Sequence, residues 1–209
     1  MIKILIADDH SIVRQGLKQI VAEENDINVC AEAGNSVELF ERLNKPECDI
    51  VILDINMPGK SGIEILKDIK LLKPDLPVLI LSMYGEEQYG VRAIKAGASG
   101  YLKKVSAPEE LVKAIRKIIS GGKYITPALA ERLADSLENY NKLPHEILSD
   151  REYEIMCKIA LGKTAEEIAE DLSISVHTVY SYRNRIFEKM NFKSNVDVSN
   201  YVSKNKLED

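Results

Sequence analysis

The stretch that decides the fold is DIVILDINMPG, residues 49–59. Its four aliphatic residues, 50–53, leave no regular polar position for a solvent-facing side. Such a run is typical of a strand covered on both faces, as in a parallel sheet. We therefore predict a strand at Asp49–Leu53 inside an α/β domain, with Asp54 at its carboxyl end.

Similar runs lie before and after this one in the chain. The other predicted strands are Lys3–Ala7, Ile27–Ala33, Val78–Ser82 and Gly100–Lys103. Amphipathic stretches, read as helices, follow the five runs at Ser11–Glu23, Val37–Asn44, Gly62–Leu72, Glu86–Ala96 and Pro108–Ser120. Ser61 with Glu64, and Ser106 with Glu109, have the spacing of a capping box. Five successive strand–helix units predict a doubly wound, flavodoxin-like α/β domain with a parallel five-stranded sheet, over residues 1–121.

The pattern changes after Gly121-Gly122, which end the last of these helices. A connector is expected over 122–147, with a helix at Pro127–Tyr140 that has Leu129, Leu133 and Leu137 on one face, and a flexible part at Asn139–Pro144. From there the chain is predicted to be all helical. A first helix is capped by Ser149 and Glu152 and ends at Gly162, and a second is capped by Thr164 and Glu167 and runs to about Leu172. Residues 173–175 form a tight turn. Two further helices are predicted at Val176–Met190 and Asn195–Lys204. We predict a small all-α helix-turn-helix domain over 148–209.

Composition agrees with two small soluble domains. The chain has 209 residues, of which 45% are hydrophobic and 29% charged. No apolar run is long enough to cross a membrane, and the N-terminus becomes acidic too early for a signal peptide, so we expect a cytoplasmic protein with no membrane partner. The three cysteines, Cys30, Cys48 and Cys157, have no metal-like or redox-like spacing and are expected to be reduced.

Polar residues gather where the predicted strands end. Asp8 and Asp9 follow the first strand, Asp54 the third, Ser82 ends the fourth and Lys104 follows the fifth. In an open parallel sheet ligands bind at this edge, where the strand order reverses. Three converging carboxylates favour a hard divalent cation, Mg²⁺, beside which one carboxylate can attack a phosphoryl donor and carry the group covalently.

Each of these residues also has an ordinary structural interpretation. An Asp pair after a strand is often a helix N-cap, a lone Asp at a strand end is usually part of a turn, and Lys104 beside Lys103 could be a solvated edge. A single serine at the position of Ser82 is weak evidence for a site. Their joint placement at one edge is what favours a phosphoryl-transfer site.

These residues closely resemble those of response-regulator receiver domains. The motifs that carry the resemblance are Asp8-Asp9-His10, residues 54–59, residues 81–84 and residues 96–104, and it spans 2–121. The resemblance implies that Asp54 is the phosphoacceptor and that Asp8, Asp9, Asp54 and the backbone carbonyl of Asn56 hold Mg²⁺. It implies that Ser82 and Tyr101 form the switch pair, that Lys104 rather than Lys103 is the site lysine, and that Asn56 and Tyr84 tune dephosphorylation.

The charge of the second half gives mixed evidence about nucleic acids. Residues 145–209 hold nine Lys and Arg against twelve Asp and Glu, yet Ser175–Asn195 holds four basic residues against Glu188 alone. A local basic face is what phosphate contact needs. An isolated polar helix face is nevertheless more often only solvated.

The helical half resembles the LuxR-type helix-turn-helix, and paired with a receiver it resembles response regulators of the NarL/FixJ class. The motifs that carry this resemblance lie at 148–152, 162–164, 167–169, 172–175, 178–179 and 188–190, within 148–207. The candidate DNA-contacting residues are Thr178, Tyr180, Ser181, Arg183, Asn184, Arg185 and Lys189. Many members have Lys and His where this chain has Tyr180 and Tyr182, so the resemblance leaves open which residue reads a base.

The resemblance implies a phosphorylation-dependent DNA-binding transcription regulator. A histidine kinase or a small phosphodonor would phosphorylate Asp54, freeing the recognition helix and favouring a homodimer, with Val198, Tyr201 and Val202 as candidate dimer contacts. The receiver would act as an enzyme only on its own aspartyl phosphate. Two alternatives remain: an Asp-nucleophile phosphatase on a similar sheet, and a regulator that works through protein–protein contacts alone.

Overall fold

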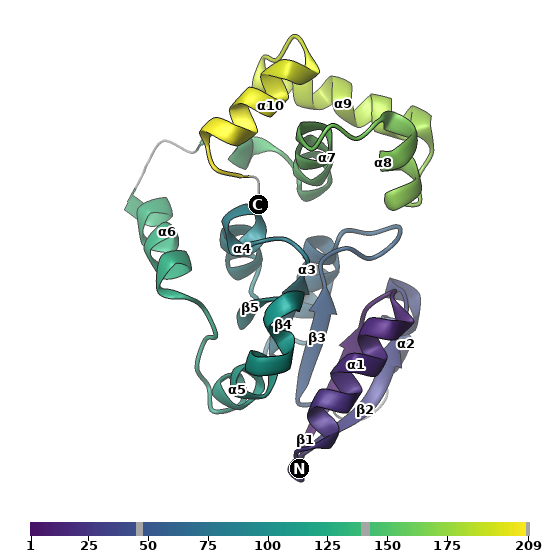
Figure 1. Ribbon diagram of the computed structural model, residues 1–209, viewed down its shortest axis with the longest axis vertical. Coiled ribbons are helices and arrows are strands. Elements are labelled where there is room, and N and C mark those ends of the chain that lie inside the picture. The colour runs from purple at the N-terminus through teal and green to yellow at the C-terminus, as the bar shows by residue number, and fades with distance from the viewer. Residues whose placement is uncertain (45–47, 139–142, 208–209) are drawn as a thin grey trace. The chain divides into compact units, whose positions relative to one another are not determined.

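The computed structural model describes residues 1–44, 48–138 and 143–207, and it divides into two compact units, 1–127 and 128–209 (Figure 1). Each unit is described by itself. Among the described residues, no helix combines the length and the apolar character that crossing a membrane would require.

The first unit is built on a parallel sheet with strand order β2-β1-β3-β4-β5. Its strands are β1 (Ile2–Ala7), β2 (Ile27–Ala33), β3 (Ile50–Asp54), β4 (Val78–Ser82) and β5 (Gly100–Lys103). Its helices are α1 (Ser11–Ala22), α2 (Ser36–Leu43), α3 (Gly62–Leu72), α4 (Glu86–Lys95) and α5 (Ala107–Ile119), with a short 3₁₀ helix, η1 (Lys104–Ser106), before α5. The predicted fold class, a doubly wound five-stranded α/β domain, is confirmed.

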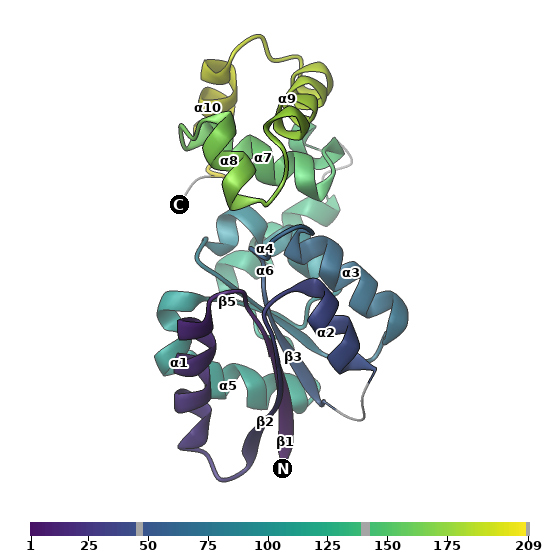
Figure 2. The same cartoon turned by 90° about the vertical axis from the view of Figure 1, so that its right-hand side faces the viewer.

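Helices cover both faces of this sheet, which explains why its central strands contain almost no polar residues. Ile4 and Ile52 point to one face, where they pack in a core with Leu17 of α1 and Leu111 of α5. The alternating residues of the same strands, such as Leu53, are equally buried on the other side. Figure 2 shows α1 and α5 on one face and α2 and α3 on the other.

The predicted helix start at Ser61 is confirmed, but the second predicted capping box is wrong. Ser61 accepts from the Glu64 amide, and the Glu64 carboxylate accepts from the Ser61 amide in return. Ser106, in contrast, has a helical backbone and makes no side-chain cap. It is already the last residue of η1, so the chain turns into α5 without the extended residue that a capping box requires.

The chain returns to the edge of the sheet after α5. Tyr101 N donates to Tyr124 O at 3.1 Å, and Tyr124 N donates to Ser99 O at 2.9 Å. This pairing passes directly over Gly100, where an added Cβ would lie 2.8 Å from Tyr124 O. Residues just beyond 121, expected from the sequence to belong to the connector, thus extend the sheet beside β5.

The second unit is all helical. It comprises α6 (Pro127–Glu138, which begins at the boundary), a 3₁₀ helix η2 (Pro144–Ile147), α7 (Asp150–Ala160), α8 (Ala165–Asp171), α9 (Val176–Met190) and α10 (Asn195–Lys204). Capping boxes at Ser149 and Thr164 start α7 and α8 as predicted. Ser173, at φ 51°, makes the turn between α8 and α9. The predicted end of the connector helix, the Leu137 side chain and most of the expected flexible part, 139–142, lie outside the described residues.

The last helix, α10, packs against α7 in the core of this unit. Val198 and Val202, expected to make dimer contacts, are fully buried there. That expectation is wrong for these two valines, because their side chains already fill the interior of their own domain. Tyr201 is half-buried, and its hydroxyl lies 3.0 Å from His145 Nδ1.

A glycine at the start of α3 allows the chain to turn back under the end of β3. A Cβ at Gly62 would collide with the Ile55 backbone and would lie 2.7 Å from Asp54 O. We expect Gly62→Ala to destabilise the first unit by about 3 kcal/mol, because the backbone on the other side of the contact cannot rotate away. Hydrogen exchange of β3 and α3 peptides would show the loss.

The control is Gly16→Ala on α1, where an added Cβ meets nothing within 4 Å. This substitution should gain about 0.5–1 kcal/mol through helix propensity. Equal protection of β3 in the two variants would contradict the steric argument.

Candidate functional sites

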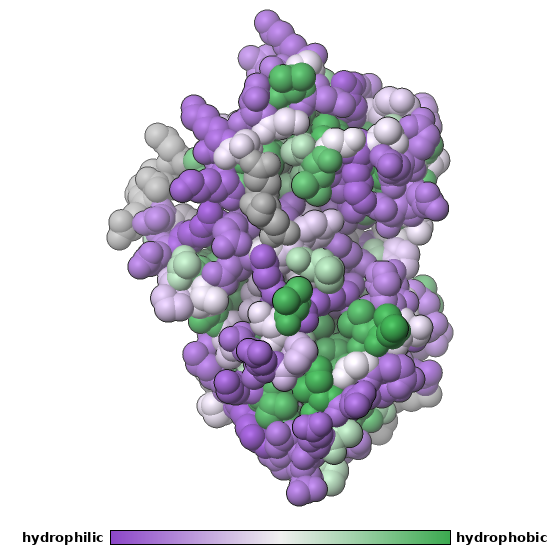
Figure 3. Space-filling model, in the orientation of Figure 1, coloured by the Kyte–Doolittle hydropathy of each residue, from purple (hydrophilic) through white to green (hydrophobic). Residues whose placement is uncertain are grey.

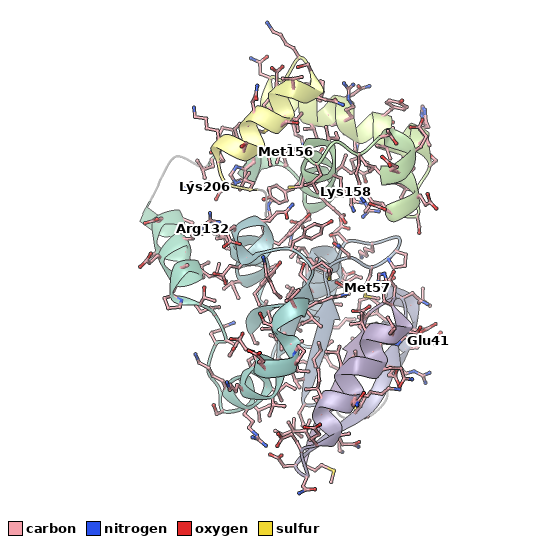
Figure 4. The ribbon with its side chains drawn as sticks, in the orientation of Figure 1. Glu41, Met57, Arg132, Met156, Lys158 and Lys206 are labelled. Atoms are coloured by element: carbon pink, nitrogen blue, oxygen red, sulfur yellow. The ribbon has the colours of Figure 1, made fainter. Side chains whose placement is uncertain are left out.

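The polar residues singled out from the sequence do converge at one edge of the sheet. Asp8 and Asp9 follow β1, and Asp54 is the last residue of the neighbouring strand β3. Ser82 ends β4 and Lys104 follows β5. The sheet order reverses between β1 and β3, so the acidic residues sit at the position where doubly wound sheets hold their ligands. Met57, labelled in Figure 4, is buried just beyond β3.

Lys104 connects two buried carboxylates. Its Nζ lies 2.7 Å from Asp54 Oδ2 and 2.7 Å from Asp8 Oδ2, while both aspartates are only 1% exposed. Asn56 N donates to the other Asp54 oxygen, Oδ1, at 3.1 Å. Asp54 is therefore fixed in orientation by one ammonium and one backbone amide.

Burial raises the pKa of the Asp54 carboxyl above its usual range, and the nearby Asp8 charge acts in the same direction. The Lys104 ammonium opposes both effects without cancelling them. For Lys104 itself, burial would lower the pKa, but Asp54 and Asp8 outweigh it and raise the pKa above its usual range. The site thus keeps Lys104 charged. Burial of the ionised Asp54 carboxylate is unfavourable, and an additional positive charge nearby would stabilise it.

The loop after β1 is ordered by two residues that follow it. His10 N donates to Asp8 Oδ1 at 2.8 Å, and His10 Nδ1 lies 2.7 Å from Asp9 Oδ1. Arg14 Nη1 donates to Asp8 O at 2.7 Å. Arg14 was not predicted from the sequence, although a basic residue one turn into the helix after an acidic pair is a signal for such a contact.

The residues at this edge fit a divalent cation. Single ligand atoms of Asp8, Asp9, His10 and Asp54 lie within 4.8 Å of one another. Three carboxylates against one ammonium leave an excess of two negative charges. Asp8 Oδ2 is buried and accepts no well-directed hydrogen bond within the described residues, although Lys104 Nζ is close to it. The three carboxylates of this cluster, without the His10 nitrogen, form the all-oxygen set that Mg²⁺ prefers.

The predicted switch residues are joined through the loop after β4. Ser82 is fully buried, and its Oγ accepts from Tyr84 N at 3.0 Å. The Tyr101 side chain is buried as well, with its hydroxyl donating to Tyr84 O at 3.0 Å. The Tyr84 ring packs on the Tyr89 ring of α4, with centroids 5.6 Å apart. Ser82 and Tyr101 therefore hold the same short segment from its two sides.

The candidate DNA-contacting residues all lie on α9, but they differ in solvent exposure and in the hydrogen bonds that their side chains already make. Tyr180, Asn184 and Arg185 are exposed. The Thr178 hydroxyl is 2.7 Å from Ser175 Oγ, in the N-cap of the helix, and Ser181 Oγ donates to His177 O at 3.0 Å. The first three side chains are thus available to a partner, whereas the two hydroxyls already bond within the helix.

Lys189 connects α9 to the start of α7. Its Nζ lies 2.6 Å from Glu152 Oε2, and Glu152 also accepts from Ser149 N at 2.8 Å. A second ion pair, between Lys158 (labelled in Figure 4) and Asp171 at 2.9 Å, joins α7 to the end of α8. The charge of Lys189, expected to face DNA, is therefore partly neutralised inside the domain.

This pairing predicts a pH dependence. Burial would raise the pKa of Glu152, but hydrogen bonds from Lys189 and from the Ser149 amide outweigh it and hold the pKa below its ordinary value of 4.5. A carboxyl whose folded pKa is lowered contributes stability above the unfolded pKa and loses it as the pH falls through the folded pKa. Glu152→Gln should cost about 1 kcal/mol at neutral pH, because Lys189 is half-exposed and the pair is screened.

Hydrogen exchange of α7 peptides measures this effect. Wild-type protection should fall between about pH 5 and pH 3, while Glu152→Gln should lose less over the same interval. Parallel curves for the two proteins would show that the Glu152 charge does not stabilise the domain.

Two family profiles match the chain. The "Response regulator receiver domain" matches residues 4–116, and "Bacterial regulatory proteins, luxR family" matches residues 146–202. The chain belongs to the response regulators in which a receiver domain precedes a LuxR-type helix-turn-helix, the NarL/FixJ class. It is thus a DNA-binding transcription regulator under phosphorylation control.

The relatives named here match over nearly their whole length. "Oxygen regulatory protein NreC" of Staphylococcus carnosus is 37% identical over 215 residues, covering 99% of this chain and 99% of that protein. "Response regulator UvrY" of Escherichia coli is 35% identical, covering 99% of this chain and 96% of that protein. RcsB from Salmonella enterica serovar Typhimurium, solved bound to promoter rprA with the phosphomimetic BeF3-, has a TM-score of 0.67 at 26% identity, covering 97% of this chain and 98% of that chain. The family is one of transcription regulators, which disfavours the phosphatase alternative.

Proposed function

We propose that Asp54 is the phosphoacceptor and that its phosphorylation controls DNA binding by the second domain. The observation that carries the proposal is the Asp54–Lys104–Asp8 arrangement, with 2.7 Å from the ammonium to each carboxylate. An Asp54 oxygen attacks phosphorus, the bond from phosphorus to the donor breaks, and an acyl phosphate forms. Lys104 neutralises charge on the transferring oxygens.

Asp8, Asp9, Asp54 and the Asn56 carbonyl would hold Mg²⁺. When bound, Mg²⁺ supplies charge neutralisation for the phosphoryl oxygens. The buried, poorly bonded Asp8 Oδ2 supports this assignment. Asn56, whose backbone amide donates to Asp54 Oδ1, and Tyr84, which follows the neighbouring strand β4, are proposed to tune hydrolysis of the acyl phosphate. The receiver would then act chemically only on itself.

The new phosphoryl group would draw the Ser82 hydroxyl, which now accepts from Tyr84 N. Because Tyr101 donates to the carbonyl of the same Tyr84, a shift at Ser82 is transmitted to Tyr101 and α4. We propose that this change frees the recognition helix, α9, and favours a homodimer.

A histidine kinase is the proposed phosphoryl donor. Two large apolar side chains are exposed beside the acidic edge: Ile12, two residues after His10, is 80% exposed, and Val105, directly after Lys104, is 78% exposed. Exposed apolar side chains beside the acceptor are candidate contacts for a docking protein. On the face that Figure 3 draws, hydrophobic residues lie among hydrophilic ones.

The proposed DNA-contacting residues are those of α9 named above: Thr178, Tyr180, Ser181, Arg183, Asn184, Arg185 and Lys189. Support comes from the exposure of Tyr180, Asn184 and Arg185, and from solved RcsB complexes with DNA, one of them titled as two RcsB dimers on two parallel DNAs. The proposed domain limits are 1–121, 122–147 and 148–209. A regulator of this kind would act in the cytoplasm, where bacterial DNA lies.

The test combines a small phosphodonor, Mg²⁺ and a DNA-retardation assay on the promoter region of the chain's own gene. Phosphorylation should require Mg²⁺ and should raise DNA affinity, and Arg185→Ala should weaken binding without unfolding the domain. Arg42→Ala, an exposed arginine on α2, is the matched control. Equal DNA affinity with and without the phosphodonor would contradict phosphorylation control, and unchanged affinity for Arg185→Ala would remove that residue from the interface.

A further inference from the structure

Arg183 is fixed on α9 by two neighbours. Its guanidinium carbon lies 4.1 Å from the centroid of the Phe187 ring, one turn further along α9. Its Nε donates to Asn195 Oδ1 at 2.9 Å, at the first residue of α10. The guanidinium plane is therefore held both by stacking and by one hydrogen bond.

This arrangement leaves the outer end of the guanidinium available. Nε is engaged, but Nη1 and Nη2 make no hydrogen bond to any of the residues that the structure describes. The two nitrogens form a planar fork whose geometry matches two oxygens of one phosphate. An arginine whose guanidinium plane is fixed, and whose Nη1 and Nη2 make no such hydrogen bond, can bind an anion with little rearrangement.

The start of α10 is not itself an anion site. The backbone amides of Lys193 and Ser194 both donate to Asp197 Oδ2, at 2.8 and 3.0 Å. Those donors are occupied by a carboxylate, which also repels other anions. The contact that the structure shows for the Asn195 side chain is instead its hydrogen bond from Arg183 Nε.

We propose that Asn195 and Phe187 are positioning residues that hold Arg183 for a contact to the DNA backbone. The proposal rests on the proposed DNA binding by α9 and adds to it a specific phosphate-binding arginine with its supports. A side chain immobilised before binding loses less conformational entropy on binding. Asn195 thus contributes to affinity without touching DNA.

Each role has its own signature in the salt dependence of binding. The logarithm of the association constant falls linearly with the logarithm of the salt concentration. Removing one phosphate contact makes this slope shallower by about 0.9 for each copy of α9 that is bound to the duplex. Losing only the positioning hydrogen bond leaves the charge in place, so the slope stays constant while affinity falls about threefold to tenfold. Arg183→Ala should show the first behaviour and Asn195→Ala the second.

The experiment uses the full-length phosphorylated chain and a duplex selected by it from random sequence. Four variants are compared with wild type across salt concentrations: Arg183→Ala, Asn195→Ala, the double variant, and Asn200→Ala as a control at an exposed asparagine on the same helix. The double variant should bind like Arg183→Ala alone, and the control should bind like wild type. Alanine at the first position of α10 favours the helix, so the Asn195 variant retains its fold.

The outcomes separate this inference from the function on which it rests. If wild type selects no duplex in either state, the proposed function fails. If wild type binds but Arg183→Ala keeps the wild-type slope, the phosphate contact is refuted. An equal loss from Asn195→Ala in the wild-type and Arg183→Ala backgrounds would show that Asn195 acts on the fold and would overturn the positioning role.

Discussion

Asp54→Asn is expected to take up no phosphoryl group from either a kinase or a small donor. The amide keeps the size of the carboxylate and one of its two acceptor oxygens but lacks its nucleophilic charge. The fold should persist, because Asp54 is buried at a desolvation cost that raises its pKa, and a neutral side chain removes that cost. Intact mass spectrometry after donor treatment measures the uptake, and a retardation assay should show DNA affinity that no longer responds to the donor.

Asp49→Asn is the matched control for this variant. Asp49 is exposed just before the other end of β3 and accepts from Lys3 N at 2.7 Å, far along the strand from Lys104. This variant should be phosphorylated as wild type is. Uptake of a phosphoryl group by Asp54→Asn would place the acceptor elsewhere, with Asp8 and Asp9 as the next carboxylates to test.

The sequence predicted the sheet well because a doubly covered strand has a distinctive composition. Val78–Ser82 and Gly100–Lys103 were predicted to the residue, and the acidic edge followed from strand ends alone. Ser106 shows the limit of such patterns: capping spacing was present, but η1 had already given the residue a helical backbone. Local spacing does not reveal how the preceding segment enters a helix.

Contacts between distant segments were the part that sequence patterns could not supply. The pairing of Tyr124 with β5, the Lys189–Glu152 ion pair and the Asn195–Arg183 hydrogen bond each join residues from different elements. The apolar spacing of Val198 and Val202 fitted a dimer surface as well as a core. Only the packing of α10 against α7 distinguishes these alternatives.

Lys104→Met is expected to change Mg²⁺ binding and phosphorylation in opposite directions. The ammonium lies 2.7 Å from Asp8 Oδ2 and from Asp54 Oδ2, so it competes with a cation for both carboxylates. Removing a like charge this near should tighten Mg²⁺ binding about tenfold or more. Phosphorylation should nevertheless slow by about 10²–10³, because the group that neutralises charge in the transition state is lost.

Lys103→Met, one residue earlier and exposed, separates this local effect from a general change of charge. Both variants lower the net charge equally, so any long-range effect on Mg²⁺ or on an anionic donor is shared between them. Lys103→Met should have the wild-type affinity for Mg²⁺ in a titration and the wild-type phosphorylation rate at saturating Mg²⁺. If Lys104→Met instead bound Mg²⁺ more weakly, the ammonium would have to act by ordering the carboxylates rather than by competing for their charge.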